Sequence, residues 1–244
     1  TGLNAEPAYI ARVVAELSKS TGEHFYSADN LVDATQNTDE LADLSAALKV
    51  TALALSKIAN DLRLMASGPR CGLNELQLPA MQPGSSIMPG KVNPVIPEVL
   101  NQTCFQVIGN DHAISLAVEA GQFELNVMEP VLAYNLFQSI TILTNAVEVF
   151  SERYVKDIAA NLPRCEELVN GSVGVVTALL PHLGYERASF VAKEALATGK
   201  SVKRIVLEHN LLNEGELNAI LAPAEMTRPG IAGEQFIRRF MQAI

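Results

Sequence analysis

The chain has 244 residues, of which 48% are apolar and 18% charged, and its mean hydropathy is +0.17. This length suffices for one or two domains with a real core, and the apolar content indicates that part of the surface is buried against other subunits. A net charge of −9 argues against general binding to nucleic acid or to anionic membranes. No uncharged apolar run approaches the ~18 residues of a membrane span, so we expect no membrane partner.

The three cysteines, Cys71, Cys104 and Cys165, are widely spaced along the chain. No CxxC pair or Cys/His cluster accompanies them, which argues against a structural zinc ion, and we expect neither a metal nor another cofactor. Free thiols are typical of a reducing compartment, and no signal peptide is recognisable. The sequence therefore predicts a cytoplasmic protein.

Four segments predict helices in the first two thirds of the chain, at residues 5–20, 38–66, 96–119 and 130–159. Apolar residues recur along the last three at spacings of three and four. In the second segment this stripe consists of Leu41, Leu44, Leu48, Thr51, Leu55, Ile58, Leu62 and Met65. Sustained stripes with few strand signals predict an all-α fold built on an elongated bundle of long helices.

Asp111 falls on the apolar stripe of residues 96–119, between Val107 and Ile114. A carboxylate there bonds a neighbouring side chain, faces a seam between subunits, or takes part in catalysis. The first two interpretations are the more common ones, and the sequence leaves the catalytic one open.

The predicted elements become shorter after Asn161-Leu162-Pro163. They are residues 164–179, 185–198, 201–208, 213–221 and 234–243, separated by residues such as Gly184, Gly199 and Pro223. Asn213 followed by Glu216 forms a capping box of the broader kind. We predict two domains, a bundle over residues 1–162 and a small helical domain over residues 163–244.

The segment PGSSIMPGKVNP, residues 83–94, lies in a long loop between two predicted helices. Six of the twelve prolines fall between Pro69 and Pro97, and Lys91 is the single charged residue between Glu75 and Glu98. Long loops are uncommon in compact domains unless they are functional. A restricted loop with one ammonium group and several hydroxyl and amide groups is typical of a site for a carboxylate or a phosphate.

The loop does not fit a nucleotide-binding P-loop, because Gly84 and Gly90 enclose five residues and Val92 stands where a hydroxyl is required. No G-x-S-x-G motif supports a hydrolase nucleophile either. The two serines, Ser85 and Ser86, remain open to two interpretations. They act chemically, with main-chain N–H groups stabilising an oxyanion, or they cap a structural turn.

The stretch GSSIMPGKVNP, residues 84–94, resembles the signature of the fumarase/aspartase superfamily. TGLNAEP at the start, SGPRCGLNEL at 67–76, Gly109-Asn110-Asp111 and PHLGY at 181–185 are also similar to segments of that superfamily, in order along the chain. Within the superfamily, residues 117–130, Pro97 and the stretch AEMTRPGIAG at 224–233 resemble the aspartate ammonia-lyase branch.

The resemblance implies the reversible deamination of L-aspartate to fumarate and ammonia, with no cofactor. A base removes a proton next to one carboxylate, an aci-carboxylate forms, and ammonia leaves. Carried over by position, Ser85 is the general base; Ser86 and main-chain groups of the loop, including Val92, help to bind the substrate. Lys91 and Asn93 hold the carboxylate that takes the developing charge, and Glu98 has a direct or supporting role beside the site.

The resemblance further implies a homotetramer assembled through the helical bundle, with active sites built from several subunits. It also implies that the first half of the family's sequence would precede TGLN, so we expect the 244-residue chain alone to be inactive or nearly so. Two alternatives remain, a fumarate hydratase acting on fumarate and L-malate, and a catalytically idle scaffold of the same fold.

Overall fold

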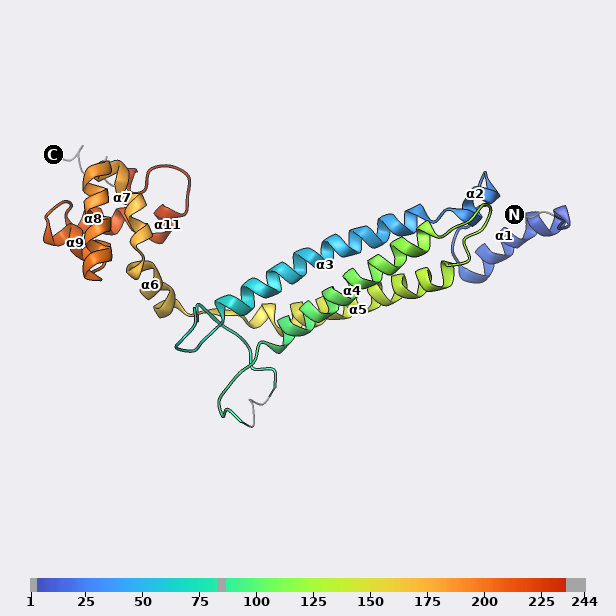
Figure 1. Cartoon of the computed structure of the whole chain (residues 1–244), viewed down its shortest axis with the longest axis horizontal. Helices are drawn as coiled ribbons and strands as arrows, with labels where there is room; N and C mark the ends of the chain where they lie inside the picture. Colours follow the sequence, from blue (N-terminus) through green and yellow to red (C-terminus); the bar gives the residue numbers. More distant parts are fainter. Residues whose placement is uncertain (1–3, 83–86, 236–244) are drawn as a thin grey trace. The chain divides into compact units, whose positions relative to one another are not determined.

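The computed structural model describes residues 4–82 and 87–235, which are mostly helical (Figure 1). The described chain divides into two compact units, with the division between Ala159 and Ala160. The predicted all-α class, with long helices packed together, is confirmed. Ser85 and Ser86 lie outside the described residues, as does most of the helix predicted at residues 234–243.

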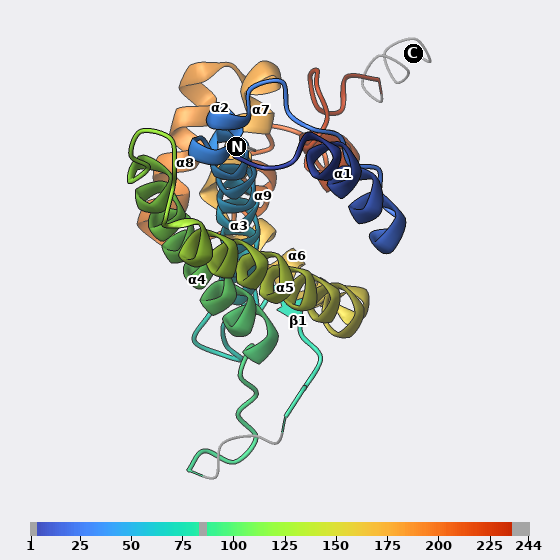
Figure 2. The same cartoon turned by 90° about the vertical axis from the view of Figure 1, so that its right-hand side faces the viewer.

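Three long helices form the body of the first unit, and they lie side by side in both views (Figures 1 and 2). They are α3 (Asp39–Met65), α4 (Val95–Glu119) and α5 (Glu129–Arg153). The shorter helices α1 (Pro7–Thr21) and α2 (Leu31–Gln36) precede them. Two-residue strands, β1 (Leu76–Gln77) and β2 (Ala159–Ala160), pair with each other.

The predicted stripe of α4 is confirmed, because Leu100, Cys104, Val107, Asp111 and Ile114 are all buried. The predicted stripe of α3 is confirmed only in part, because Leu48, Leu55 and Leu62 pack against the core as partly buried side chains. The buried side chains of α3 are Ser45, Ala52, Ser56 and Ala59, whereas Leu41, Leu44 and Ile58 are exposed. Small side chains let the α3 backbone approach α4 closely, so the larger leucines flank the seam instead of filling it.

Asp111 bonds its neighbours across the seam between α3 and α4. Its Oδ1 accepts a hydrogen bond of 2.8 Å from the Ser45 hydroxyl, and its Oδ2 lies 2.6 Å from the Lys49 ammonium. The carboxylate is buried but both of its oxygens are paired, which is the condition for a stable buried charge. The interpretation in which Asp111 bonds a neighbour is therefore the one that these contacts support.

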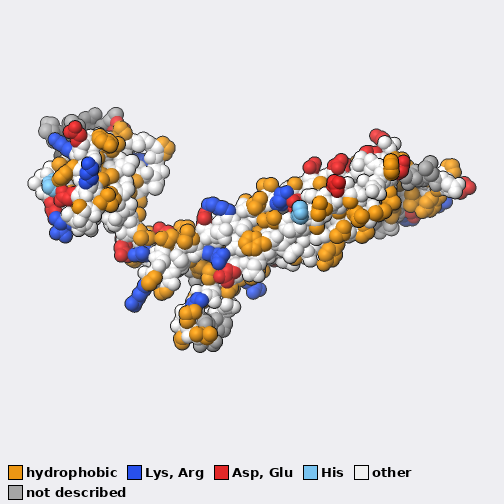
Figure 3. Space-filling model, viewed as in Figure 1, with side chains coloured by type: hydrophobic (Ala, Val, Ile, Leu, Met, Phe, Trp, Pro, Cys, Tyr) orange, Lys and Arg blue, Asp and Glu red, His pale blue; other side chains and the backbone are white. Residues whose placement is uncertain are grey.

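Large apolar side chains remain exposed over the outside of the three-helix bundle (Figure 3). On α3, α4 and α5 they include Leu44, Val50, Leu53, Leu64, Phe105, Leu116, Tyr134 and Phe137. No helix among the described residues has the length and apolar character needed to cross a lipid bilayer.

The second unit consists of short helices. They are α6 (Leu162–Gly171), α7 (Val176–Leu183), α8 (Tyr185–Thr198), α9 (Val202–Glu208), α10 (Glu214–Ile220) and α11 (Pro223–Met226). Their core is apolar and includes Leu179, Val191, Ile205, Val206, Leu217 and Ile220. The capping box of Asn213 and Glu216 is present as predicted.

Two predicted helices differ from the observed ones in where they end. The helix predicted at 130–159 stops at Arg153, because Tyr154 leaves the helical region of backbone conformation, and a short 3-10 helix (Val155–Asp157) follows. The helix predicted at 164–179 is broken after Gly171. Ser172 is extended there and its hydroxyl accepts the N–H of Gly174 at 3.1 Å, which caps a new 3-10 turn (Val173–Val175) instead of continuing α6.

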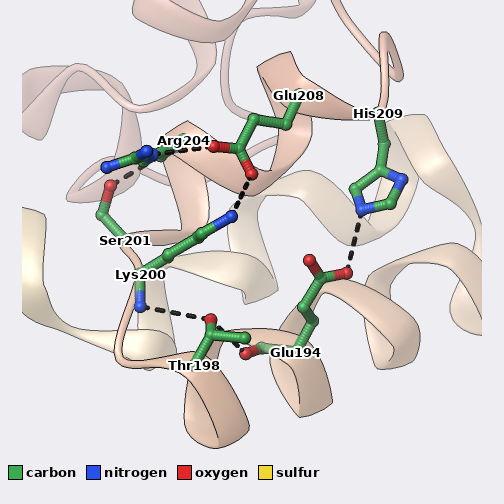
Figure 4. A network of polar contacts seen from close by, with 7 residues as sticks. All are labelled: Glu194, Thr198, Lys200, Ser201, Arg204, Glu208 and His209. Carbon is green, nitrogen blue, oxygen red and sulfur yellow. Dashed lines mark hydrogen bonds and ion pairs between the residues drawn. The ribbon is translucent and has the colours of Figure 1, made fainter.

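The surface of α8 and α9 carries a connected set of charged side chains (Figure 4). The Glu208 carboxylate lies 2.6 Å from the Lys200 ammonium and 2.8 Å from Nε of Arg204, while Glu194 pairs with His209 at 2.9 Å. Hydrogen bonds from Lys200, the larger contribution, and from Arg204 hold the pKa of Glu208 below its usual value. These contacts lie at the surface, so they contribute little to stability.

Candidate functional site at the stem of the signature loop

The loop that carries the superfamily-like signature leaves the bundle at the end of α3 and returns at the start of α4 (Figure 1). Its described parts are residues 66–82 and 87–94. We call the two places where it joins the helices the loop stem, comprising residues 63–75 of the α3 side and 91–101 of the α4 side.

The α3 side of the stem is fixed by Ser67. Its hydroxyl donates to the carbonyl of Leu64 at 2.6 Å and accepts the N–H of Leu73 at 3.2 Å, and its carbonyl accepts the N–H of Asn74 at 2.7 Å. The backbone passes so close to itself that a Cβ on Gly72 would lie 2.3 Å from the Ser67 carbonyl oxygen. A glycine is therefore required at position 72, and the loop leaves α3 in a defined direction.

The α4 side of the stem carries the predicted substrate-binding residues. The N–H of Lys91 donates to the carbonyl of Met88 at 3.1 Å, and Gly90 supplies the positive φ of +81° in this turn. Lys91 and Val92 are exposed and Asn93 is half-buried. Among the described residues the Lys91 ammonium has no hydrogen bond or ion pair, so it is available to an anion.

Glu98 belongs to a polar cluster that spans α3 and α4. Nη2 of Arg63 lies 3.7 Å from Oε1 of Glu98, and Nη1 of Arg63 donates to Oδ1 of Asn101 at 3.2 Å. The Asn101 amide in turn donates to the hydroxyl and the carbonyl of Ser56, at 2.9 and 3.1 Å. Asn101 is buried, whereas 37% of the Glu98 side chain is exposed.

Tyr154, where α5 ends, has a buried hydroxyl that makes no hydrogen bond to the described residues. Burial raises the pKa of Tyr154 to about 12, although the positive charge of Arg63 acts in the opposite direction. Nε of Arg63 is likewise buried without a hydrogen-bond partner among those residues. The guanidinium of Arg63, on α3, therefore interacts with side chains at the start of α4 and at the end of α5.

Sequence reasoning selected Lys91, Asn93 and Glu98 but missed Arg63, Asn101 and Tyr154. Arg63 and Asn101 are 38 residues apart and meet only because α3 and α4 pack face to face. A signal did exist, because each is a polar residue within two turns of the loop on a helix that flanks it. Tyr154 falls within the helix predicted at residues 130–159, and its burial fits an apolar stripe there although its hydroxyl does not.

The second unit holds a separate cavity of about 310 Å³ under the stretch AEMTRPGIAG. One oxygen of Glu225 pairs with Arg228, and its other oxygen accepts the N–H of Gly233 at 3.1 Å. The hydrogen bond from Arg228, the larger contribution, and the one from the Gly233 N–H lower the pKa of Glu225. The motif thus closes on itself, and the carboxylate that lines the cavity, Glu225, is already engaged by Arg228 and Gly233.

Two family models match the chain. One, described as "Lyase", matches residues 1–109, and the other, described as "Fumarase C C-terminus", matches residues 175–228. The first match contains α3 and the whole signature loop, including both sides of the stem.

Curated relatives extend the likeness along nearly the whole chain. The aspartate ammonia-lyase of Bacillus subtilis is 58% identical over 239 residues, which are 98% of this chain and 50% of that protein. The aspartate ammonia-lyase of Helicobacter pylori is 51% identical over 94% of this chain and 49% of that protein. The chain therefore spans about half the length of the curated relatives it matches.

Solved structures show the same fold. The fumarate lyase:delta crystallin of Brucella melitensis superposes with a TM-score of 0.86 at 46% identity, over 94% of this chain and 50% of that one. The class II fumarase of Schistosoma mansoni gives a TM-score of 0.82 at 36% identity, over 94% and 51%. The chain thus has the fold of the fumarate lyases to which it is similar. The chain belongs to the fumarase/aspartase family. The two curated relatives reported above are aspartate ammonia-lyases of that family.

Proposed function

We propose that this chain provides the catalytic loop of an aspartate ammonia-lyase, which converts L-aspartate to fumarate and ammonia. The observation that carries the proposal is the 58% identity with the Bacillus subtilis aspartate ammonia-lyase over 98% of the chain, signature loop included. Identity with the class II fumarase of Schistosoma mansoni is lower, at 36%. The chemistry of the loop suits an elimination next to a carboxylate, because it offers a cation and amide groups beside two serines.

The proposed mechanism is an elimination in two stages. Ser85 removes a proton from the carbon next to one carboxylate of aspartate, and the electron pair of that C–H bond moves into the carboxylate to form an aci-carboxylate. Lys91 and Asn93, assisted by Ser86 and the main chain at Val92, stabilise the added negative charge. That pair then returns to form the C=C bond as the C–N bond breaks, and ammonia and fumarate leave.

Preorganised donors favour this step because they meet charge that develops on oxygen during the reaction. The Lys91 ammonium, which has no partner among the described residues, and the hydrogen-bonded stem on both sides of the loop support such preorganisation. The serine would need a strongly lowered pKa to act as a base near neutrality, and that part of the mechanism rests on the family.

The assembly proposed for this enzyme is a homotetramer joined through the helical bundle. The large apolar side chains exposed over α3, α4 and α5 support it, since apolar surface gathered on helices is typical of an interface. The chain spans about half the length of its relatives, and we propose that residues 1–244 alone turn over little or no substrate.

The test joins the N-terminal half of the Bacillus subtilis relative to residues 1–244, giving what we call the joined enzyme. Fumarate formation is followed by ultraviolet absorbance, with L-aspartate and L-malate in parallel. We expect fumarate from L-aspartate. Fumarate from L-malate alone would identify a fumarate hydratase, and an assembled joined enzyme without activity on either substrate would favour the idle scaffold.

Substitution of the base is the first site prediction. We expect Ser85→Ala to lower kcat of the joined enzyme by about 10²- to 10⁴-fold, the usual contribution of a positioned base, without changing its assembled mass. Ser151→Ala, at an exposed serine near the end of α5, is the matched control and should leave kcat unchanged. Full activity of Ser85→Ala would remove Ser85 from the mechanism.

A further inference from the structure

Arg63 links α3 to α4, the two helices that the signature loop connects. It lies in the last turn of α3, and both of its terminal nitrogens are directed to α4. One contacts Asn101, which is locked to Ser56 by two hydrogen bonds, and the other faces Glu98 in the first turn of α4. The planar guanidinium therefore has one end anchored in the buried seam and the other end at the open side of the stem.

The anchored end is the more rigid of the two. Asn101 is buried and fully engaged with α3, so it holds Nη1 of Arg63 in place. Nε of Arg63 is buried as well and has no hydrogen-bond partner among the described residues. A buried donor without a partner is costly, so this orientation persists because the contacts at the tip of the guanidinium outweigh that cost.

The open end is where chemistry can be influenced. The contact of 3.7 Å with Glu98 is too long for a strong hydrogen bond, and the Glu98 carboxylate stays partly exposed. If Arg63 served only to tie α3 to α4, the buried pair of Asn101 and Ser56 would already do so. What the guanidinium adds is a direction for the Glu98 carboxylate and a restraint on the first turn of α4.

The predicted substrate-binding residues come directly before that first turn. Asn93 lies two residues before α4 begins, its carbonyl accepts the N–H of Val95 at 2.9 Å, and Pro94 accepts the N–H of Glu98 at 3.1 Å. A displacement of Glu98 is thus transmitted to Asn93 and Lys91 through a short stretch of hydrogen-bonded backbone. We propose that Arg63 is a positioning residue that orients Glu98 and, with it, the Lys91–Asn93 carboxylate clamp. The proposal rests on the lyase function argued above.

A double-mutant cycle in the joined enzyme tests the coupling, using Arg63→Met, Glu98→Gln and the two together. We expect each single variant to lower kcat/KM by about 10- to 100-fold. The kcat/KM of the double variant should be no more than about threefold below that of the less active single variant, because the effects of coupled residues are not additive. Arg63→Lys should be intermediate, since an ammonium can face Glu98 but cannot hold Asn101 at the same time.

The control is Lys57→Met, which removes a cation from the same helix at its exposed pair with Asp61, and it should stay within about twofold of the parent. Losses that multiply in the double variant would overturn the proposal, because Arg63 would then act independently of Glu98. Full activity of Glu98→Gln would overturn it too, while leaving the lyase function intact.

A second measurement does not depend on activity. Hydrogen exchange of the 244-residue chain should show faster exchange at the N–H groups of Val95 and Glu98 in Arg63→Met, and no change there in Lys57→Met. If the joined enzyme proves inactive, the proposed function fails and this measurement still decides whether Arg63 restrains the stem. Unchanged exchange in Arg63→Met would overturn that restraint.

Discussion

Both units of the chain have an apolar core, and they differ in the polar side chains that they bury. In the first unit the fully buried set includes Ser45, Asn101, Asn110 and Asp111, while large apolar side chains lie exposed on α3, α4 and α5. In the second unit the described core is apolar, and the paired charges, such as Glu208 with Lys200 and Arg204, lie on the surface. Among the described residues, buried polar side chains are thus a feature of the first unit and not of the second.

The difference teaches what each unit is suited to do. Polar side chains buried in helix seams fix how helices face one another, a use for which buried polar groups are well attested. Asn110 is an example, since its amide donates to the Ser139 hydroxyl on α5 at 3.0 Å and to Gln138 at 2.9 Å. A bundle with specified seams and large apolar side chains exposed on its outside is suited to packing against further helices.

The largest effect is expected from removing the buried charge of Asp111. Asp111→Asn keeps the shape of the side chain but leaves the Lys49 ammonium without its partner, and we expect the free energy of unfolding to fall by about 3 kcal/mol. This lies at the low end for buried pairs because 36% of the Lys49 side chain is exposed and can regain water. Urea denaturation, with hydrogen exchange on α3 and α4 peptides, assigns the loss to the first unit.

The matched variant in the second unit is Glu208→Gln. Glu208 also has two partners, yet both contacts are at the surface, so we expect no measurable change in its denaturation midpoint. An equal loss from both variants would break the comparison, since it would show that burial does not separate the two carboxylates.

A smaller effect, visible only at high pH, is expected at Tyr154. Its pKa in the folded chain is raised to about 12 from an ordinary value near 10, because burial disfavours the phenolate. A raised pKa gives stability that is complete below about pH 10 and is lost as pH rises toward 12, about 2–3 kcal/mol in all. Stability measured from pH 8 to 11.5 should fall less steeply in Tyr154→Phe than in the parent chain.

The same substitution has a consequence near neutrality. The Tyr154 hydroxyl is buried and has no hydrogen-bond partner among the described residues, so its removal should leave stability unchanged or raise it by up to about 1 kcal/mol. A clear loss of stability at pH 7 in Tyr154→Phe would show instead that the hydroxyl makes a favourable contact.

The sequence predicted most of this fold because helix periodicity is a local signal. The stripe of α4 and the capping box at Asn213 need only neighbours within a few turns to be recognised. The small buried side chains of α3 were missed because Ser45, Ala52 and Ser56 give little hydrophobic signal. Their value lies in letting two backbones approach, which depends on a partner helix that periodicity alone does not identify.

The candidate site divides along the same line. Lys91 and Asn93 were found because the loop carries a short, unusual sequence motif, and their roles stay predictions, as do those of Ser85 and Ser86 outside the described residues. Arg63 was not found because its importance comes from Glu98 and Asn101, which lie on another helix. A residue whose role depends on partners far away along the chain leaves no local pattern in the sequence.

The smallest effect on folding, and the most direct test of the comparison, concerns the exposed apolar surface of α5. Phe137 is 67% exposed, and Tyr134 lies one turn before it on the same face. Replacing both with serine should change the unfolding of a single chain by less than about 0.5 kcal/mol, as for most surface positions. The same change should weaken association with other helices, because it removes apolar area that such contacts would bury.

Light scattering coupled to gel filtration measures that association, on the 244-residue chain and on the joined enzyme. Leu196→Ser is the control, since Leu196 is 74% exposed on α8 of the second unit, where we expect no partner. A lower associated mass for Phe137→Ser with Tyr134→Ser, and an unchanged mass for Leu196→Ser, would place the docking surface on the bundle. The reverse pattern would mean that the second unit, despite its complete core, is the one that requires a partner.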